Sequence, residues 1–289
     1  MRGMRLMFAG LLAGVLALEM VAAQGSRAAP KMERATFPSA QGIEITGYYF
    51  RPEGNGPFPA VIGMHGCGGL FGSNRTILSP NRLDWAQRFL NAGYVVLFPD
   101  TYEPRGLLSV CEIKPNEQTV RLADHVGDLI GALAWLSAQS FVDKDRVALV
   151  GWGVGGSAVL RILDPAFSLH QSVDLKAAIA FYPRCEPMER GPDYVPRLSP
   201  TILMGAADEW VSPQSCNALS MRWGSPIVLY PGAFHNFDVP GVPVRVRRTG
   251  EGPKRAGTNP AAREKAIRQV RDILVGAFGT VSSRPKKGT

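Results

Sequence analysis

The sequence predicts a single α/β domain built around a mostly parallel sheet. Three observations lead to this prediction. Short apolar runs, suited to strands buried on both faces, alternate along the chain with amphipathic helical segments. The chain has 289 residues, of which 45% are hydrophobic and 19% are charged, so it is long enough for one large core. One apolar run leads through a tight glycine-rich turn into a helix of small residues.

The first 23 residues have the pattern of a secretory signal peptide. Arg2 and Arg5 precede an apolar run from Leu6 to Leu18, and Val21-Ala22-Ala23 supplies the small residues of a cleavage site. The run is shorter than the ~20 residues that a membrane-spanning helix needs. We therefore expect a periplasmic or secreted protein with no stable membrane insertion after cleavage.

The remaining chain divides into three parts. A polar segment at 24–34 precedes the folded domain at 35–279, and a basic tail at 280–289 follows it. The net charge is +8, and basic residues gather late in the chain, in the tail and in a stretch at 242–258. No aromatic residues are interleaved there for base stacking. We therefore expect a solvated loop and tail, and no nucleic-acid partner.

The expected strands are assigned from apolar runs and the turns that bound them. Residues 43–50 are expected to form an antiparallel edge strand, and the Pro- and Gly-rich stretch 53–59 a hairpin connection. The buried parallel strands are expected at 60–64, 94–98, 147–150, 177–181, 201–204 and 227–230.

The expected helices carry start signals and apolar stripes. A capping side chain precedes a proline at Ser79-Pro80, Ser212-Pro213 and Asn259-Pro260. Apolar residues recur at helical spacing within 117–138 and 261–278. Two stretches without periodicity, 101–115 and 183–200, follow strands, so we expect them at the carboxyl end of the sheet, where ligands of open α/β sheets bind.

The turn after residues 147–150 has the form of a nucleophile elbow. It reads Gly151-Trp152-Gly153-Val154-Gly155-Gly156 between a strand and a helix, which matches the pattern G-x-nucleophile-x-G-G. The middle position is Gly153, which accepts a positive φ angle easily but presents no oxygen or sulfur. A generic glycine-rich turn is the alternative interpretation of this segment alone.

Two later residues complete an acid–base pair in the expected order. Asp208 follows the strand at 201–204, and His235 follows the strand at 227–230. Elbow, acid, base is the chain order of the α/β-hydrolase triad, in which the aspartate fixes the imidazole tautomer and stabilises its positive charge. We therefore assign the nucleophile position to Gly153, the acid to Asp208 and the base to His235.

An oxyanion loop is predicted after the strand at 60–64. It reads His65-Gly66-Cys67-Gly68-Gly69, and loops of this type turn backbone N–H groups toward a developing oxyanion. We expect the amides of Cys67 and Val154 to be the donors. His65 is expected to be a structural histidine rather than a second base.

These motifs together resemble the dienelactone hydrolase family, in particular its exported branch, from about residue 35 to residue 278. The matching pieces include H-G-C-G-G at Cys67, G-Y-V-V-L-F-P-D ending at Asp100, M-G-A-A-D-E-W at Asp208 and Y-P-G-A-F-H at His235. The resemblance implies an α/β-hydrolase fold with eight strands and helices on both faces. It also implies hydrolysis of a small-molecule ester or lactone without a cofactor.

The sequence departs from the family at two places. The family's nucleophile is a cysteine or serine, and the matching residue here is Gly153. Dienelactone hydrolases proper also carry a glutamate in the oxyanion loop, which is absent here, so dienelactone itself is not the expected substrate. The candidates for a replacement nucleophile are the side chains of Cys67, Ser157 and Cys185. A further candidate is a water molecule that His235 activates in the space beside Gly153.

Three further residues are assigned to substrate binding. Arg105 lies after the strand at 94–98 and either pairs with a substrate carboxylate or forms a salt bridge with a nearby acid. Trp152 and Trp210 lie beside the elbow and the acid. No metal site is expected, because the four cysteines at 67, 111, 185 and 216 are not clustered with histidine. In an oxidising compartment four cysteines allow three pairings, which the sequence leaves open.

Two functions follow from these patterns. The first is an exported ester or lactone hydrolase whose activity is diminished or mediated by water. The second is a non-catalytic small-molecule binding protein that has kept the pocket and lost the chemistry. The oligomeric state is not indicated by the sequence.

Overall fold

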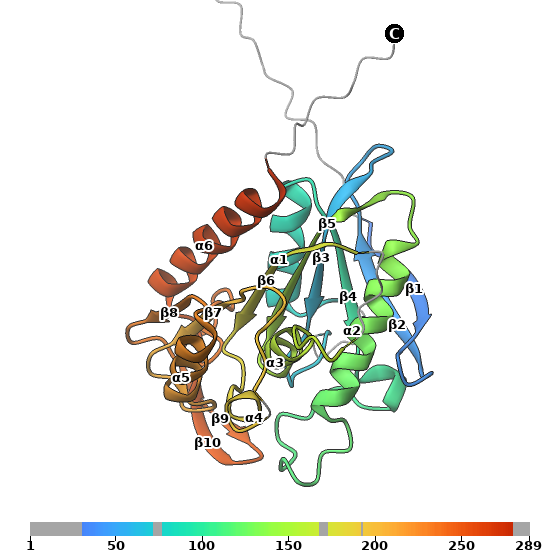
Figure 1. Ribbon diagram of the computed structural model, residues 1–289. Helices are drawn as coiled ribbons and strands as arrows, with labels where there is room; N and C mark the ends of the chain where they lie inside the picture. The colour runs from blue at the N-terminus through green and yellow to red at the C-terminus, as the bar shows by residue number, and fades with distance from the viewer. Residues whose placement is uncertain (1–30, 72–76, 168–172, 192, 280–289) are drawn as a thin grey trace, which may run out of the picture.

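The structure is a computed structural model that describes residues 31–71, 77–167, 173–191 and 193–279 (Figure 1). The predicted signal peptide at 1–23, most of the polar segment at 24–34 and the basic tail at 280–289 lie outside these residues. Among the helices of the described chain, none has the length and apolar character needed to cross a membrane.

The centre of the molecule is a sheet of eight strands in the order β1-β2-β4-β3-β5-β6-β7-β8. Strands β3 to β8 run parallel to one another, whereas β2 is antiparallel to both β1 and β4. This mostly parallel eight-stranded sheet confirms the predicted fold class. The strands are β1 (Glu33–Pro38), β2 (Glu44–Phe50), β3 (Phe58–Met64), β4 (Val95–Asp100), β5 (Val142–Trp152), β6 (Leu175–Phe181), β7 (Thr201–Gly205) and β8 (Ile227–Tyr230).

Two details of the predicted sheet edge were wrong. Residues 43–50 form β2, which is antiparallel as expected but second from the edge, because the unpredicted strand β1 pairs with its outer side. The stretch 53–59 is not a hairpin connection, since β2 pairs with β4 and not with β3. An apolar run identifies a strand but does not reveal its neighbour, which depends on contacts between distant segments.

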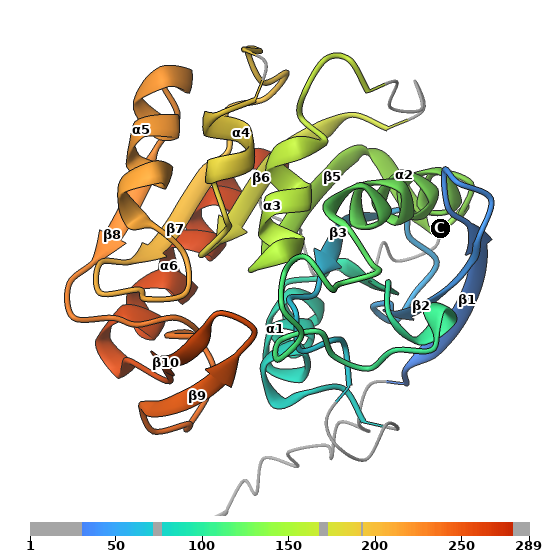
Figure 2. The same cartoon turned by 90° about the horizontal axis from the view of Figure 1, so that it is seen from below.

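Helices cover both faces of the sheet. Figure 2 shows α1 (Pro80–Asn91) and α6 (Pro260–Phe278) on one side, and α2 (Leu122–Ser137) and α3 (Val154–Arg161) on the other. The remaining helices are α4 (Glu186–Glu189), α5 (Pro213–Trp223) and the 3₁₀ helix η1 (Glu103–Arg105). The apolar core forms two main clusters, of which one includes the buried residues of α1 and α6 and the other those of α2.

The predicted helix starts are confirmed at all three Pro-containing positions. The side chain of Ser212 accepts a hydrogen bond from the Ser215 N–H, and Asn259 accepts one from the Ala262 N–H, so each satisfies a free amide of the first turn. Ser79 precedes α1 without a side-chain cap of this kind, and Pro80 alone marks that start.

The basic stretch at 242–258 contains a β-hairpin rather than an open loop. Strands β9 (Arg245–Thr249) and β10 (Gly252–Ala256) pair in a separate two-stranded sheet. The hairpin lies at the same end of the molecule as α4 (Figure 1), where the loops after the parallel strands also gather. The hairpin therefore stands beside the predicted site.

Candidate active site

The elbow between β5 and α3 has the predicted sharp geometry. Gly153 lies between them with φ 55° and ψ −122°, a backbone conformation that L-residues adopt only under strain. Its N–H donates to the carbonyl of Phe181 on the neighbouring strand β6, at 3.0 Å. A Cβ on Gly155 would overlap the backbone oxygens of Met64 and His65, so that position requires glycine for space. These close approaches fix the turn against β3.

Gly153 itself has room for a side chain. A Cβ built on this residue would lie 3.7 Å from the Gly66 Cα and 4.0 Å from Nε2 of His235, which are ordinary contact distances. An atom one bond beyond that Cβ therefore comes within hydrogen-bonding distance of the imidazole. Gly153 thus has the backbone geometry expected of the elbow, with open space where a side chain would lie.

The predicted acid and base are in contact. Nδ1 of His235 lies 2.8 Å from Oδ2 of Asp208, and both side chains are almost completely buried. The other carboxylate oxygen of Asp208 accepts the backbone N–H groups of Trp210 at 2.8 Å and Val211 at 3.2 Å. With Nδ1 held by the carboxylate, Nε2 of His235 faces the elbow and is the nitrogen that can accept a proton.

Backbone contacts between the two loops bring this pair together. The Ala207 N–H donates to the Ala233 carbonyl at 3.0 Å, and the Ala206 N–H donates to that of Tyr230 at 2.9 Å. A side chain on Gly205, the last residue of β7, would collide with the Ala233 carbonyl. Glycine at the strand end therefore lets the acid and base loops touch.

Two aromatic rings hold the imidazole in place. The indole of Trp210 stacks on His235 with ring centroids 4.7 Å apart and an interplanar angle of 3°, and the Tyr182 ring lies at 4.4 Å. Tyr182 has a positive φ of 37°, unusual for a residue other than glycine. Aromatic contacts of this kind restrict the ring to one orientation.

The loop after β3 occupies the position expected of an oxyanion hole. Both Cys67 and Val154 line the same cavity as Gly153 and His235. Val154 is the first residue of α3, and N–H groups in a first helical turn have no partner within the helix. The Cys67 carbonyl accepts the Val110 N–H at 2.8 Å, which anchors the loop from its other side.

The four cysteines form two disulfides, Cys67–Cys111 and Cys185–Cys216. This pairing excludes Cys67 and Cys185 as replacement nucleophiles, because neither carries a free thiol. The hydroxyl of Ser157 accepts the Arg184 N–H at 2.9 Å, and its one proton faces the Arg184 carbonyl at 3.1 Å, so it ties α3 to the next loop. Ser157 therefore takes the packing role expected of it.

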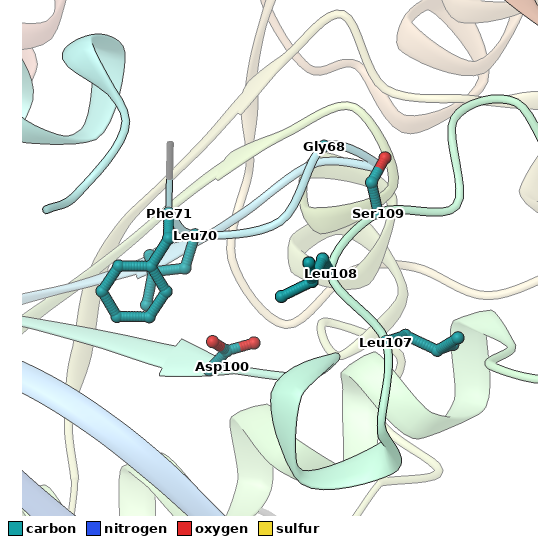
Figure 3. A pocket seen from close by; sticks show the side chains of 7 residues that line it. All are labelled: Gly68, Leu70, Phe71, Asp100, Leu107, Leu108 and Ser109. Atoms are coloured by element: carbon teal, nitrogen blue, oxygen red, sulfur yellow. The ribbon is translucent and has the colours of Figure 1, made fainter. Parts of the chain in front are cut away.

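The cavity at the site has a volume of about 470 Å³, within the range of small-molecule sites. Its walls come from the oxyanion loop, the elbow, the loops at 101–115 and 183–200, and the β9–β10 hairpin. A smaller cavity of about 180 Å³ lies beside it, among Leu70, Phe71, Leu107 and Leu108 (Figure 3). Among the described residues, Asp100 is the one acidic side chain that lines it, and Gly153 and His235 do not.

Arg105 does not line the large cavity, and its assignment to substrate binding was wrong. Its Nη1 and Nη2 each lie 2.9 Å from the carboxylate of Asp128, and Nη1 also donates to the Thr101 carbonyl. The salt bridge considered as the alternative is therefore the one formed. Asp128 is fully buried on α2, and a buried carboxylate needs a cationic partner.

The two tryptophans have different roles. Trp210 lines the cavity and stacks on His235. Trp152 contributes to the cavity wall but has no exposed surface, and its Nε1–H donates to Asp238 at 2.9 Å. Trp152 is thus mainly a core residue beside the elbow.

His65 is a structural histidine, as predicted. Its Nε2 accepts the Thr101 N–H at 3.0 Å and its Nδ1 lies 2.9 Å from the Gly66 carbonyl, an arrangement that fits the neutral ring protonated on Nδ1. Burial lowers the pKa of His65, while nearby Asp100 opposes this effect.

Several residues that line the cavity were not predicted from the sequence. Arg82 on α1, Tyr102 after β4, His125 on α2 and Tyr182 after β6 all line the cavity. The two helical residues lie within amphipathic patterns, where a polar residue indicates a solvated face. Tyr182 could have been noted because it directly follows a buried strand. No group of three His, Cys, Asp or Glu side chains that could hold a metal occurs within the described residues.

Comparison with known proteins identifies the family. Residues 45–277 match the model of the dienelactone hydrolase family, so the chain belongs to that family. A search of curated proteins found no matching relative.

Solved structures show the same fold at low sequence identity. A candidate dienelactone hydrolase from Klebsiella pneumoniae subsp. pneumoniae is 19% identical, with a TM-score of 0.63 over 86% of this chain and 99% of that one. A dienelactone hydrolase-like promiscuous phosphotriesterase from metagenomic libraries is 19% identical, with a TM-score of 0.64 over 87% and 100%. Esterase 2 of Thermogutta terrifontis is 17% identical, with a TM-score of 0.59 over 89% and 100%.

Proposed function

We propose that this protein hydrolyses a small-molecule carboxylic ester or lactone with a water molecule in place of a side-chain nucleophile. The observation that carries the proposal is the Asp208–His235 pair, whose Nε2 faces an open space beside Gly153. A protein that has lost the reaction has no need to keep a buried, hydrogen-bonded acid–base pair next to an oxyanion loop.

In this mechanism Nε2 of His235 removes a proton from the water as its oxygen attacks the substrate carbonyl. The carbonyl π-electrons move to oxygen, and the N–H groups of Cys67 and Val154 stabilise the oxyanion. Asp208 stabilises the imidazolium. The tetrahedral intermediate then collapses, the C–O bond to the leaving alcohol breaks, and His235 returns the proton to the alkoxide oxygen. No acyl-enzyme is formed.

The expected rate is low. A hydrolase without a triad member retains roughly a 10³–10⁴-fold acceleration over water, from the oxyanion hole and substrate binding alone. His235 adds general-base catalysis to this, a contribution of about 10²–10⁴-fold.

The glycine at position 153 also favours a second function. The protein would then be a non-catalytic binding protein for the same class of ligand. It shares the cavity and the fold with the first function and differs in needing no turnover.

We also propose that the protein is exported to the periplasm or beyond the cell. The signal-peptide pattern at 1–23 and the two disulfides support this, because disulfides persist mainly in oxidising compartments. Sequencing the N-terminus of the protein from a cell-envelope fraction tests it. A chain that still begins at Met1 contradicts export by cleavage.

The catalytic test compares three substitutions at one position. Short-chain p-nitrophenyl esters and a simple lactone are offered to the mature protein and to Gly153→Ala, Gly153→Ser and Gly153→Cys. Gly153→Ala adds a Cβ 4.0 Å from the base and fills the water's space, so it should abolish turnover. Gly153→Ser differs from it by one oxygen and should raise turnover above the parent.

His235→Ala is the companion variant. Parent turnover that disappears in His235→Ala supports the water mechanism. A parent without turnover, together with an active Gly153→Ser variant, identifies the binding protein. Parent turnover that is unchanged in both Gly153→Ala and His235→Ala would falsify the site assignment.

A further inference from the structure

A fully buried carboxylate lies behind the candidate active site, three residues after the predicted base. Asp238 has no exposed surface and accepts hydrogen bonds from four side chains. Its Oδ2 accepts from Asn81 at 3.2 Å, Trp85 at 2.8 Å and Trp152 at 2.9 Å. Its Oδ1 accepts from the Tyr182 hydroxyl at 2.7 Å. Hydrogen bonds to a buried carboxylate are strong, so this group fixes the positions of all four donors.

Two of these donors belong to the site itself. Trp152 is the last residue of β5 and directly precedes Gly153, so the position of its indole is tied to that of the elbow. Tyr182 follows β6, and its ring lies 4.4 Å from that of His235. The carboxylate of Asp238 therefore connects the elbow and the base at one point.

Asp238 is in turn anchored to helices that cover the sheet. Two of its donors lie on α1, and Arg263 on α6 donates to its backbone carbonyl at 3.0 Å. Arg82, also on α1, stacks on Trp152 and interacts electrostatically with the Asp238 carboxylate. Because α1 and α6 pack on the same side of the sheet (Figure 2), the loop that carries His235 is fastened to the rigid part of the domain.

The backbone of Tyr182 needs support of this kind. Its φ of 37° is unfavourable for a residue with a side chain, and such a conformation persists only where the surroundings hold it. Its N–H donates to the Leu203 carbonyl at 2.8 Å, and its hydroxyl donates to Asp238. Burial raises the pKa of Tyr182 and the Asp238 carboxylate adds to the effect, so the hydroxyl keeps its proton and remains a donor. The Tyr182 ring is thus held at both ends against the imidazole of His235.

We propose that Asp238 is a positioning residue of the hydrolytic reaction, which fixes the imidazole of His235 opposite the elbow through Tyr182 and Trp152. The alternative is a core carboxylate that stabilises the fold and has no influence on the base. The inference rests on the proposed function for its effect on turnover. Its effect on the orientation of His235 does not, because a non-catalytic binding protein would share it.

The orientation of His235 can be measured without any turnover. In the mature protein with isotope-labelled histidine, the Nδ1–H of His235 should give a resolved NMR signal, because it is buried and lies 2.8 Å from the Asp208 carboxylate. His235→Gln assigns this signal by removing it. We expect the signal to shift and broaden in Asp238→Asn, which keeps the shape of the side chain and removes its charge. Tyr182→Phe removes a single hydroxyl and should have the same effect.

Tyr230→Phe is the matched control. Tyr230 ends β8, its ring lies 4.9 Å from that of Phe237, and its buried hydroxyl makes no hydrogen bond within the described chain. The substitution therefore removes a buried hydroxyl near the base without taking a hydrogen bond from Asp238. The His235 signal should stay unchanged in this variant. Urea denaturation verifies that each variant folds, and Tyr182→Phe decides the question if Asp238→Asn does not fold.

Steady-state kinetics are the second arm of the test. In the Gly153→Ser background, Asp238→Asn and Tyr182→Phe should each lower kcat by about tenfold to a hundredfold and change KM less, because a displacement of the base by ~1 Å costs up to that factor. Since both substitutions act through one hydrogen bond, the double variant should lower kcat no further than Asp238→Asn alone.

Two results overturn the inference. One is a His235 signal that stays unchanged in folded Asp238→Asn or in Tyr182→Phe, and the other is a loss of kcat in these variants no larger than that in Tyr230→Phe. A signal that responds to Asp238→Asn, in a protein that shows no turnover even as Gly153→Ser, rules out the hydrolase proposal alone. Turnover by Gly153→Ser that is unaffected by Asp238→Asn rules out the positioning role alone.

Discussion

A nucleophile elbow requires a sharp backbone turn and a side chain that the turn presents, and Gly153 has the first without the second. The backbone adopts the sharp conformation of the turn, with φ 55°, while the side chain that this conformation serves to present is absent. Glycine reaches such angles at little steric cost, so the turn is relaxed here where a serine or cysteine would be strained. On the proposed assignment of Gly153 to the nucleophile position, the lack of an attacking atom accompanies a relaxed turn.

Two glycine substitutions in the elbow should therefore lower the free energy of unfolding by different amounts. Gly153→Ala should lower the free energy of unfolding by only about 1 kcal/mol, because the position is open and only the positive φ is unfavourable. Gly155→Ala should cost about 3 kcal/mol or more, since its Cβ would overlap the backbone oxygens of Met64 and His65. Urea denaturation measures both.

The control is Gly224→Ala, at the end of α5. Gly224 has φ 62° and ψ 27° and no atom within 4 Å of a built Cβ, so it measures the cost of an ordinary left-handed position. Because ψ at Gly153 is −122°, Gly153→Ala should cost somewhat more than Gly224→Ala, and a cost as large as that of Gly155→Ala would contradict the open space beside His235.

At the scale of elements, the ends of the parallel strands were the most predictable part of the molecule. Asp208, His235 and Gly153 each lie within about five residues of the end of a short apolar run, and parallel strands bring such ends to one edge of the sheet. Both loops without periodicity reach the cavity, as expected. The acid–base contact could therefore be anticipated from local patterns alone.

Other elements depend on contacts that a local pattern does not encode. The hairpin at 245–256 is strongly basic and mostly exposed, so nothing in its composition distinguishes it from a solvated loop. Arg82 was missed for a related reason, because an arginine within an amphipathic helix ordinarily faces solvent. Its burial depends on the stacking of its guanidinium on Trp152, which lies at the end of a distant strand.

The disulfide Cys67–Cys111 joins the oxyanion loop to the loop after β4, and this predicts a kinetic effect. In the Gly153→Ser background, replacing both cysteines by serine should lower kcat by about tenfold or more and change KM less, because donors to the oxyanion act in the transition state. Steady-state kinetics on one ester measure the change in kcat and the change in KM separately.

The control for this prediction is the pair Cys185→Ser and Cys216→Ser, which removes a disulfide between α4 and α5. This control should lower the free energy of unfolding by about 2–4 kcal/mol and leave the Cys67 amide in place. An equal loss of kcat in both double variants argues against a role of the first disulfide in placing the oxyanion loop.

At the scale of the whole molecule, two buried histidines link stability to pH. Burial lowers the pKa of His65, with Asp100 opposing the effect, and lowers that of His125 well below its usual value, with His65 and Arg105 adding to the effect. Each stays neutral in the folded protein and gains a proton on unfolding at mildly acidic pH. The unfolded chain then binds more protons than the folded one.

Stability should therefore be fully present above the unfolded histidine pKa of about 6.5, and should fall as the pH drops below it. The slope reaches about 1.4 kcal/mol per pH unit for each histidine that remains neutral in the folded state. Urea titrations between pH 7.5 and about 4.5 measure it. His125→Phe should flatten the slope, and an unchanged slope in that variant assigns the acid sensitivity to other groups.

The vacant elbow position has a consequence for pharmacology. Organophosphorus inhibitors inactivate serine esterases by bonding permanently to the nucleophilic oxygen, and their potency depends on that bond. Gly153 has no side-chain atom that could attack the phosphorus of such a reagent, and the cavity residues Cys67 and Cys111 are joined in a disulfide. Any inhibition by these compounds should be reversible and relieved by dilution. The protein would thus keep its ligand cavity intact after exposure to organophosphorus compounds that inactivate esterases with a complete triad.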